Sequence, residues 1–137
     1  VAESCTGGML GERLTSIPGS SDVFLGGIIA YHNDVKRNAL GVCAEDIDRY
    51  GAVSEQVALQ MAAGVRERMK AQVAVSITGI AGPGGGTAEK PVGLVWVAVH
   101  HADGHARRFH VPGDRNEIRQ RATQAALEMV RRALSNG

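Results

Sequence analysis

The stretch VAVSITGIAGPGGGT, residues 73–87, decides the expected fold because it runs from a β-strand straight into a loop. Residues 73–78 are apolar and rich in β-branched side chains, which favour strands. The glycines and the proline that follow cannot form regular structure. Neither a nucleotide-binding Gly-Lys-Ser/Thr ending nor a helix follows the loop. The amides of this loop, with the hydroxyls of Thr78 and Thr87, could cradle a phosphate or line a ligand cleft. A purely structural loop is the alternative.

Regular elements are expected on both sides of this stretch. Before it, Ser54 can cap an amphipathic helix whose apolar face repeats at helical spacing up to Met69. After it, residues 92–100 and 105–111 are expected to be strands joined by a tight turn containing Asp-Gly. Asp114 and Glu117 then resemble a capping box in front of a second amphipathic helix.

The amino-terminal half adds shorter elements. Residues 1–3 are expected to end a strand, 6–16 to form a helix and 26–31 to form a buried strand. A short helix should follow, capped by Asn33 or Asp34 and closed by Gly41. Helices that alternate with strands and a final hairpin predict an α/β fold of three layers, a mixed β-sheet flanked by helices on both faces. Residues 1–137 are expected to form a single domain.

Composition narrows the class of protein. The formal net charge is +1 and the basic residues are scattered, so no nucleic-acid surface is expected. The two cysteines sit in no metal-binding or disulfide pattern, which predicts a cytoplasmic protein without a metal site. No apolar run approaches the roughly 18 residues of a membrane span. Because the chain starts at Val1 and reaches a glycine turn at once, we expect the natural protein to extend further at this end.

The segment AESCTGG, residues 2–8, is the first candidate for chemistry. If a strand ends at Glu3 and a helix follows, Ser4 lies at the turn between them. Amides at a helix start lack acceptors and can hold a developing oxyanion or an anion. By itself the pattern favours a serine or threonine that only caps the helix.

A serine nucleophile needs a base, and the chain offers histidines and lysines. Most of the histidines fall in the expected hairpin, where a solvated face is favoured over a metal or catalytic cluster, and His32 can equally be a loop residue. Lys70 ends a helix and reads as structural, whereas Lys90 either binds a phosphate or is exposed. Lys36 begins a helix after a strand, where sites often form. To act as a base it needs a pKa about 3 units below normal, which costs on the order of 4 kcal/mol and requires burial.

Three segments taken together resemble one family. AESCTGG at 2–8, YHNDVK at 31–36 and TGIAGPGG at 78–85, the last leading to EKPVG at 89–93, have the order and spacing of the CinA C-terminal-domain family. The similarity also includes GAVS at 51–54 and GDR at 113–115, so it covers nearly the whole chain. Members of that family usually carry a helix and most of a strand before the first segment, which this chain lacks.

The resemblance implies hydrolysis of the carboxamide of nicotinamide mononucleotide to nicotinic acid mononucleotide and ammonia. It implies a metal-independent amidohydrolase with a serine/lysine dyad, no cofactor, and a homodimer or larger homo-oligomer. The catalytic residues would be Ser4, Lys36 and Tyr31, and the backbone of Cys5, Thr6 and Gly7 would hold the oxyanion. The expected substrate-binding residues are Gly8, Asn33, Thr78, Gly79, Gly82, Gly84, Gly85, Lys90 and Arg115, with Arg115 or Lys90 on the ribosyl phosphate.

Two other interpretations remain open at this point. Cys5 neighbours Ser4, and a thiolate at a helix start would be activated by the helix dipole, so a cysteine hydrolase is the nearest chemical rival. A non-catalytic nucleotide-binding or regulatory module is the second, because family members also occur fused to a larger domain and are linked to competence. Such a module would need only the glycine segments.

Overall fold

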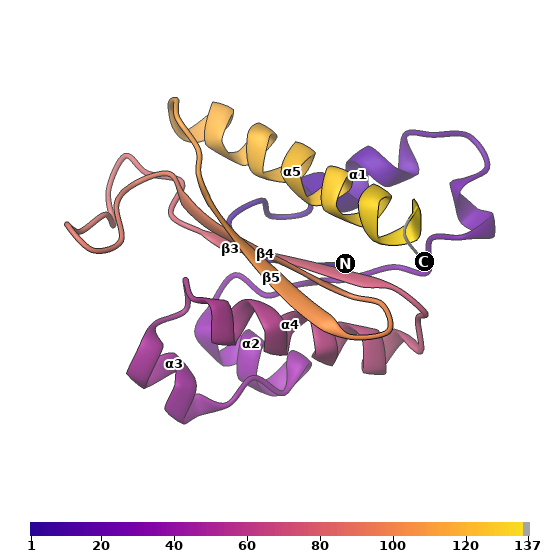
Figure 1. Ribbon diagram of the computed structural model, residues 1–137, viewed down its shortest axis with the longest axis horizontal. Coiled ribbons are helices and arrows are strands. Elements are labelled where there is room, and N and C mark those ends of the chain that lie inside the picture. Colours follow the sequence, from indigo (N-terminus) through magenta and orange to yellow (C-terminus); the bar gives the residue numbers. More distant parts are fainter. Residues whose placement is uncertain (136–137) are drawn as a thin grey trace.

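The computed structural model describes residues 1–135, which form a five-stranded mixed sheet between two layers of helices (Figure 1). The strand order is β2-β1-β3-β4-β5. β1 runs parallel to both β2 and β3, and β4 and β5 continue the sheet antiparallel. The strands are β1 Ala2–Glu3, β2 Ile28–Ile29, β3 Ala74–Gly79, β4 Leu94–His100 and β5 Gly104–His110.

The helices divide between the two faces of the sheet (Figure 1). One face carries α1 Met9–Thr15 and α5 Arg115–Ser135, and a short 3-10 helix, η1 Ser20–Asp22, follows α1. The other face carries α2 Asn33–Leu40, α3 Ala44–Tyr50 and α4 Glu55–Met69. The predicted three-layer α/β architecture is therefore confirmed.

Strand alternation in β3 explains why helices cover both faces. Val75 and Ile77 belong to an apolar cluster with α5, which contributes Ile118 and Ala122 among others. Ala74, on the opposite face, packs in a second cluster with residues of α4. A central strand that is apolar on both sides can be stable only when each face is covered.

Several elements form where the sequence predicts them. The Ser54 hydroxyl accepts a hydrogen bond from the Val57 amide and caps α4. Asp114 and Glu117 bond reciprocally to each other's amides in front of α5, which is the predicted capping box. Gly41 ends α2 in the left-handed conformation, with φ of 72°.

Other expectations are wrong at the amino-terminal end. The helix expected over 6–16 begins only at Met9, because residues 4–8 form a turn that ends on Gly8 with φ of 111°. The strand expected to be buried over 26–31 is the two-residue edge strand β2, and Ile29 is 54% exposed. An apolar run cannot distinguish an edge strand from a central one.

The cap of α2 and the presence of α3 also differ from the expectation. His32, rather than Asn33 or Asp34, caps α2, because its Nδ1 accepts a hydrogen bond from the Asp34 amide. Helix α3 was not predicted at all, since its seven residues show little apolar periodicity.

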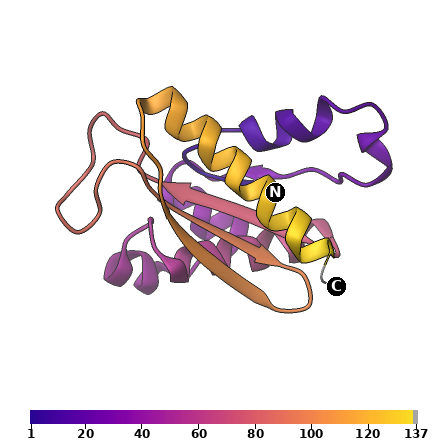
Figure 2. The same ribbon diagram turned by 45° about the horizontal axis from the view of Figure 1, so that its top comes forward.

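The loop from Gly79 to Thr87 leaves the sheet at the end of β3 and extends away from its body, as Figures 1 and 2 both show. The loop returns through Pro91 to β4. Within residues 1–135, no helix combines the length and the apolar character needed to cross a membrane.

Candidate active site

A cavity of about 220 Å³ opens where the three parallel strands end. Ser4 follows β1, Tyr31 comes two residues after β2, and Thr78 and Gly79 end β3. Ligand sites of open α/β sheets form at such carboxyl ends because the loops there converge. The cavity is lined by Ser4, Cys5, Tyr31, Asn33, Lys36, Ala52, Val53, Thr78, Gly79, Ala81 and Arg115.

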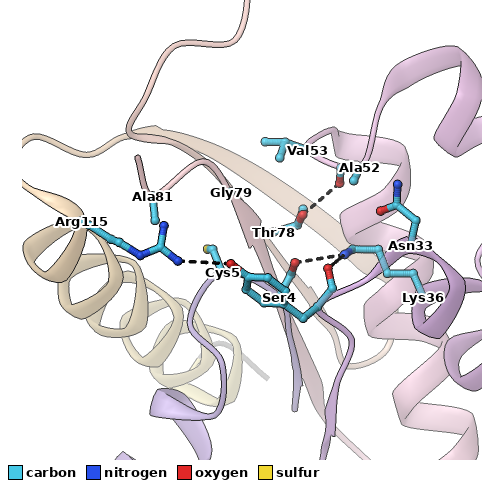
Figure 3. Close-up of a pocket in the computed structure, with 11 residues that line it drawn as sticks. Ser4, Cys5, Asn33, Lys36, Ala52, Val53, Thr78, Gly79, Ala81 and Arg115 are labelled. Carbon is cyan, nitrogen blue, oxygen red and sulfur yellow. Dashed lines mark hydrogen bonds between the residues drawn. The ribbon is translucent and has the colours of Figure 1, made fainter. Parts of the chain in front are cut away.

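Ser4 is fixed by its backbone and points into this cavity (Figure 3). Its amide donates to the Ile77 carbonyl at 3.0 Å, which continues the pairing of β1 with β3 by one residue. Strand alternation then turns the side chain toward the α2 face of the sheet. The residue is 8% exposed, so its hydroxyl is reached only from the cavity.

Lys36 reaches the same hydroxyl from α2 (Figure 3). Its Nζ donates to Ser4 Oγ at 3.0 Å, which meets the distance that a serine/lysine pair requires. The side chain is 1% exposed. Desolvation by burial lowers the pKa of Lys36 from its ordinary value to about 8.

The other contacts of Lys36 determine what its nitrogen can do. Nζ also donates to the carbonyls of Ala30 at 2.8 Å and Tyr31 at 3.1 Å. A neutral amine has two N–H groups and one lone pair. When both N–H groups are held by these carbonyls, the lone pair is left directed at Ser4 Oγ, where it can accept the hydroxyl proton.

Glu3 organises the turn after β1, and its role was missed in the sequence. Its carboxylate, 1% exposed, accepts hydrogen bonds from the amides of Leu10 at 2.8 Å and Gly11 at 3.0 Å. It also accepts one from the Thr6 hydroxyl at 2.6 Å. The first free amides of α1 are thus occupied by Glu3 and are not available to a substrate.

The amides expected to hold an oxyanion are not equivalent. The Gly7 amide donates to the Ser4 carbonyl at 3.0 Å and is occupied within the turn. Among the described residues, the amides of Cys5 and Thr6 have no acceptor. Gly8 faces the Ile29 side chain, and of the residues Cys5 to Gly8 only Cys5 lines the cavity.

Cys5 lies in the cavity wall but not in the setting of a reactive thiol. Burial raises the pKa of its thiol to about 11, the opposite of what a thiolate nucleophile requires. Its Sγ is so close to β3 that a Cβ on Gly79 would lie 3.2 Å away. Gly79 therefore allows the end of β3 to approach the turn after β1.

Arg115 spans the mouth of the cavity from the first residue of α5. Its Nη1 donates to the Gly82 carbonyl at 2.7 Å and its Nη2 to the Tyr31 hydroxyl at 3.2 Å. Tyr31 is 60% exposed, so its ring is open to solvent and to a ligand. A cation and an aromatic ring thus meet on the side of the cavity opposite Lys36.

The structure does not bring all the expected residues to the cavity. Gly84 and Gly85 are exposed on the extended loop, and Gly82 contributes only the carbonyl that holds Arg115. Lys90 donates to the Tyr50 carbonyl and lines a separate, more open cavity with Trp96 and Arg108.

Other lining residues were not expected at the site, although two of them belong to the GAVS segment at 51–54. Ala52 and Val53 come from the connection before α4, and the Thr78 hydroxyl donates to the Ala52 carbonyl at 2.9 Å. Arg119 does not line the cavity but holds its wall, donating to the carbonyls of Cys5 and Thr6. Its spacing of four residues from Arg115 was the available signal, because such pairs share one helix face.

No group of three His, Cys, Asp or Glu side chains lies close enough together to hold a metal ion in the part of the chain that the structure describes. The polar groups gathered at the cavity are instead a hydroxyl, a buried amine, a guanidinium and backbone amides. Such a set suits the binding of a neutral or anionic organic molecule and attack on it by an oxygen nucleophile.

Fold and site define a three-layer α/β domain with a serine and a buried lysine paired at the ends of parallel strands. The family model of the CinA C-terminal domain matches residues 1–134. The chain belongs to the CinA C-terminal-domain family.

Named relatives agree with this membership. A CinA-like protein of Gemmatimonas aurantiaca is 62% identical, over 98% of this chain and 32% of its own length. A putative competence-damage inducible protein of Halothermothrix orenii is 52% identical, over 98% of this chain and 33% of its own. The chain spans about a third of the length of these relatives.

Solved structures share the fold. The competence/damage inducible protein of Agrobacterium tumefaciens is 49% identical with a TM-score of 0.91, over 94% of this chain and 80% of that one. A CinA superfamily protein of Klebsiella pneumoniae is 31% identical with a TM-score of 0.95, and the match covers 99% of this chain and 86% of that one.

Proposed function

We propose that this domain hydrolyses the carboxamide of nicotinamide mononucleotide to nicotinic acid mononucleotide and ammonia, with Ser4 as nucleophile and Lys36 as base. The observation that carries the proposal is the buried Lys36 amine, held by two carbonyls and directed at Ser4 Oγ. A buried lysine with a lowered pKa that contacts a serine hydroxyl in a cavity is typical of a catalytic base. The substrate follows from the family resemblance.

The proposed acylation begins with neutral Lys36. Its lone pair takes the Ser4 proton while Oγ forms a bond to the amide carbon, and the carbonyl oxygen becomes an oxyanion. The amides of Cys5 and Thr6 hold that oxyanion. When the tetrahedral carbon collapses, the C–N bond breaks, and the Lys36 ammonium gives its proton to the leaving nitrogen, which departs as ammonia.

Deacylation uses the same groups. A water molecule enters the space that ammonia has left, and Lys36 removes its proton as the oxygen attacks the ester carbon. The bond to Ser4 Oγ breaks and Oγ takes back the proton from Lys36. Nicotinic acid mononucleotide leaves, and both residues return to their starting state.

Binding of the nucleotide phosphate is assigned to the wall of the cavity that carries Arg115, opposite Lys36. Arg115 already lines the cavity, and a guanidinium can form paired hydrogen bonds with a phosphate. Lys90, the other candidate, lies in a separate cavity with its ammonium on a backbone carbonyl. We therefore assign the ribosyl phosphate to Arg115, while Asn33 and Thr78 contact the rest of the nucleotide. Tyr31 was expected among the catalytic residues, but its hydroxyl accepts a hydrogen bond from Arg115 and has no part in the steps above, so we assign it to nucleotide binding as well.

The decisive experiment mixes the purified domain with nicotinamide mononucleotide and measures released ammonia and the nucleotide acid. Ser4→Ala should abolish both products, and Cys5→Ala should leave them largely intact because the thiol is protonated and buried. The opposite result for the two variants makes the serine mechanism wrong. Nucleotide binding without ammonia release in the wild type supports the non-catalytic module instead.

A further inference from the structure

Arg119 touches the turn that carries Ser4 from the face of the sheet opposite Lys36. Its Nε donates to the Cys5 carbonyl at 3.0 Å and its Nη2 to the Thr6 carbonyl at 3.1 Å. The guanidinium is partly buried against this turn, and a Cβ on Gly7 would lie 3.5 Å from Nη2. A charged side chain that binds two successive carbonyls fixes two successive peptide units.

The two peptide units show where this contact aims the backbone. In a planar trans peptide the N–H points opposite to the C=O. The unit between Thr6 and Gly7 has its carbonyl on Arg119 and its N–H on the Ser4 carbonyl. The neighbouring unit also has its carbonyl on Arg119, so its N–H, that of Thr6, points away from Arg119, as does the Gly7 N–H that bonds the Ser4 carbonyl.

The Thr6 amide is the donor that this arrangement leaves available. No acceptor for it is found within residues 1–135, although Thr6 itself is fully buried. Glu3 holds the same residue from its side chain, through the Thr6 hydroxyl. Thr6, two residues after the nucleophile, is thus held by an anion through its hydroxyl and by a cation through its carbonyl, and its N–H has no partner among the described residues.

We propose that Arg119 is a positioning residue, which orients and polarises the Thr6 N–H as a donor to the oxyanion formed on attack by Ser4. This inference rests on the proposed serine mechanism. The charge-assisted bond to the Cys5 carbonyl draws electron density through the peptide unit and strengthens its N–H as a donor. Arg119 itself touches no reacting atom.

The experiment measures acylation of Ser4 by p-nitrophenyl acetate in the domain variants Arg119→Ala, Arg119→Lys and Arg121→Ala. The released nitrophenolate gives the rate, and peptide mass analysis locates the acetyl group. Arg121, on the same helix, is an exposed control that contacts Glu117 and the Pro112 carbonyl instead. Ammonia release from nicotinamide mononucleotide is measured in parallel.

Arg119→Ala should lower the acylation rate constant about 10- to 100-fold, somewhat less than loss of an oxyanion donor itself. The half-saturating ester concentration and the pH midpoint should stay unchanged, because Lys36 and the cavity are intact. Arg119→Lys, whose single ammonium replaces a planar fork, should lose an intermediate amount while melting near the wild-type temperature. Added ethylguanidinium should restore part of the Arg119→Ala rate.

Three results overturn the inference. The first is an Arg119→Ala rate within about twofold of that of Arg121→Ala. The second is a change confined to the half-saturating concentration, which would indicate substrate binding. The third is a loss that ethylguanidinium does not restore and that Arg119→Lys does not share, which would indicate a folding defect.

The two proposals can fail separately. If the wild type releases no ammonia but its Ser4 is acetylated in an Arg119-dependent way, the amidase function fails and the positioning role stands. If the wild type releases ammonia and Arg119→Ala does so equally fast, the positioning role fails and the function stands.

Discussion

Two glycine-rich segments follow neighbouring parallel strands, and only one of them is built rigidly into the cavity. The Ser4 turn, residues 4–8, follows β1 and is tied to Glu3 on one side and Arg119 on the other. The Gly79 loop, residues 79–87, follows β3, and only its first residues, Gly79 and Ala81, line the cavity. The rest of the loop extends away from the sheet (Figure 2).

The difference teaches that glycine content does not identify a ligand-binding segment. In the Ser4 turn, glycines serve close packing beside buried charged groups that fix each peptide. In the Gly79 loop, a Cβ on Gly84 would meet nothing within 4 Å. The contacts that hold the backbone, rather than its composition, distinguish the two segments.

The largest effect is expected where the Ser4 turn meets Lys36. Lys36→Met keeps the apolar stem but removes the base, so kcat should fall by about 10³-fold or more. Ammonia release measures the loss, and far-ultraviolet circular dichroism checks the fold. Retention of more than about a tenth of the activity would contradict the role of Lys36 as base.

The pH dependence should show the lowered pKa of Lys36. Because the neutral amine is the active form, kcat/KM should rise roughly 50-fold between about pH 6 and pH 8 and level off above it. With a base of ordinary lysine pKa, 10.5, kcat/KM would continue to rise well above pH 8. A profile that is flat across this range would show that no group with a pKa near 8 acts as the base.

The lowered pKa of Lys36 also makes the free energy of unfolding depend on pH. Between about pH 8 and pH 10.5 the unfolded chain holds a proton on Lys36 that the folded domain has lost. The contribution of Lys36 to the free energy of unfolding therefore rises with pH in this window. Urea unfolding of the wild type and Lys36→Met at several pH values would detect the difference.

Glu3→Gln tests what fixes the Ser4 turn. The amide cannot replace both carboxylate oxygens as acceptors for Leu10, Gly11 and Thr6, so the free energy of unfolding should fall by about 2 kcal/mol. Urea unfolding measures it. An exposed carboxylate, Glu67, provides the matched control as Glu67→Gln, and equal stability of the two variants would show that Glu3 does not hold the turn.

Arg115→Gln tests the mouth of the cavity. Loss of the guanidinium should raise KM for nicotinamide mononucleotide about 10-fold or more while kcat changes little, because the phosphate lies far from the reacting carbon. Steady-state ammonia release gives both constants, and Lys90→Gln is the comparison. An unchanged KM in Arg115→Gln, or a larger rise in Lys90→Gln, makes the phosphate assignment wrong.

The smallest effect is expected in the outer part of the Gly79 loop. Gly84→Ala should change stability by less than about 0.5 kcal/mol and leave ammonia release within about twofold of wild type. Gly82→Ala is the contrasting variant, since Gly82 has φ of 76° and its Cβ would lie 2.5 Å from Val92 Cγ1. A strong loss of activity in Gly84→Ala would show that this part of the loop also contacts the substrate.

The long elements could be predicted because their signals are local. Helices α4 and α5 carry their apolar faces and their caps within a few residues, and β3 is a short β-branched run ended by glycines. The start of α1 could not be predicted in this way. It depends on Glu3, which reaches from β1 to amides seven and eight residues further on.

The sequence alone determined the three-layer architecture, because periodicity and caps are written in neighbouring residues, and it singled out Ser4 and Lys36 through the order and spacing of the family's motifs. Only the tertiary structure decided that these side chains lie 3.0 Å apart and that the amine is buried. It also decided that Arg115 belongs to the cavity and Lys90 does not, and that Arg119 holds the turn from more than 110 positions away. Desolvation and hydrogen bonding depend on distances between segments, and these arise only when the chain has folded.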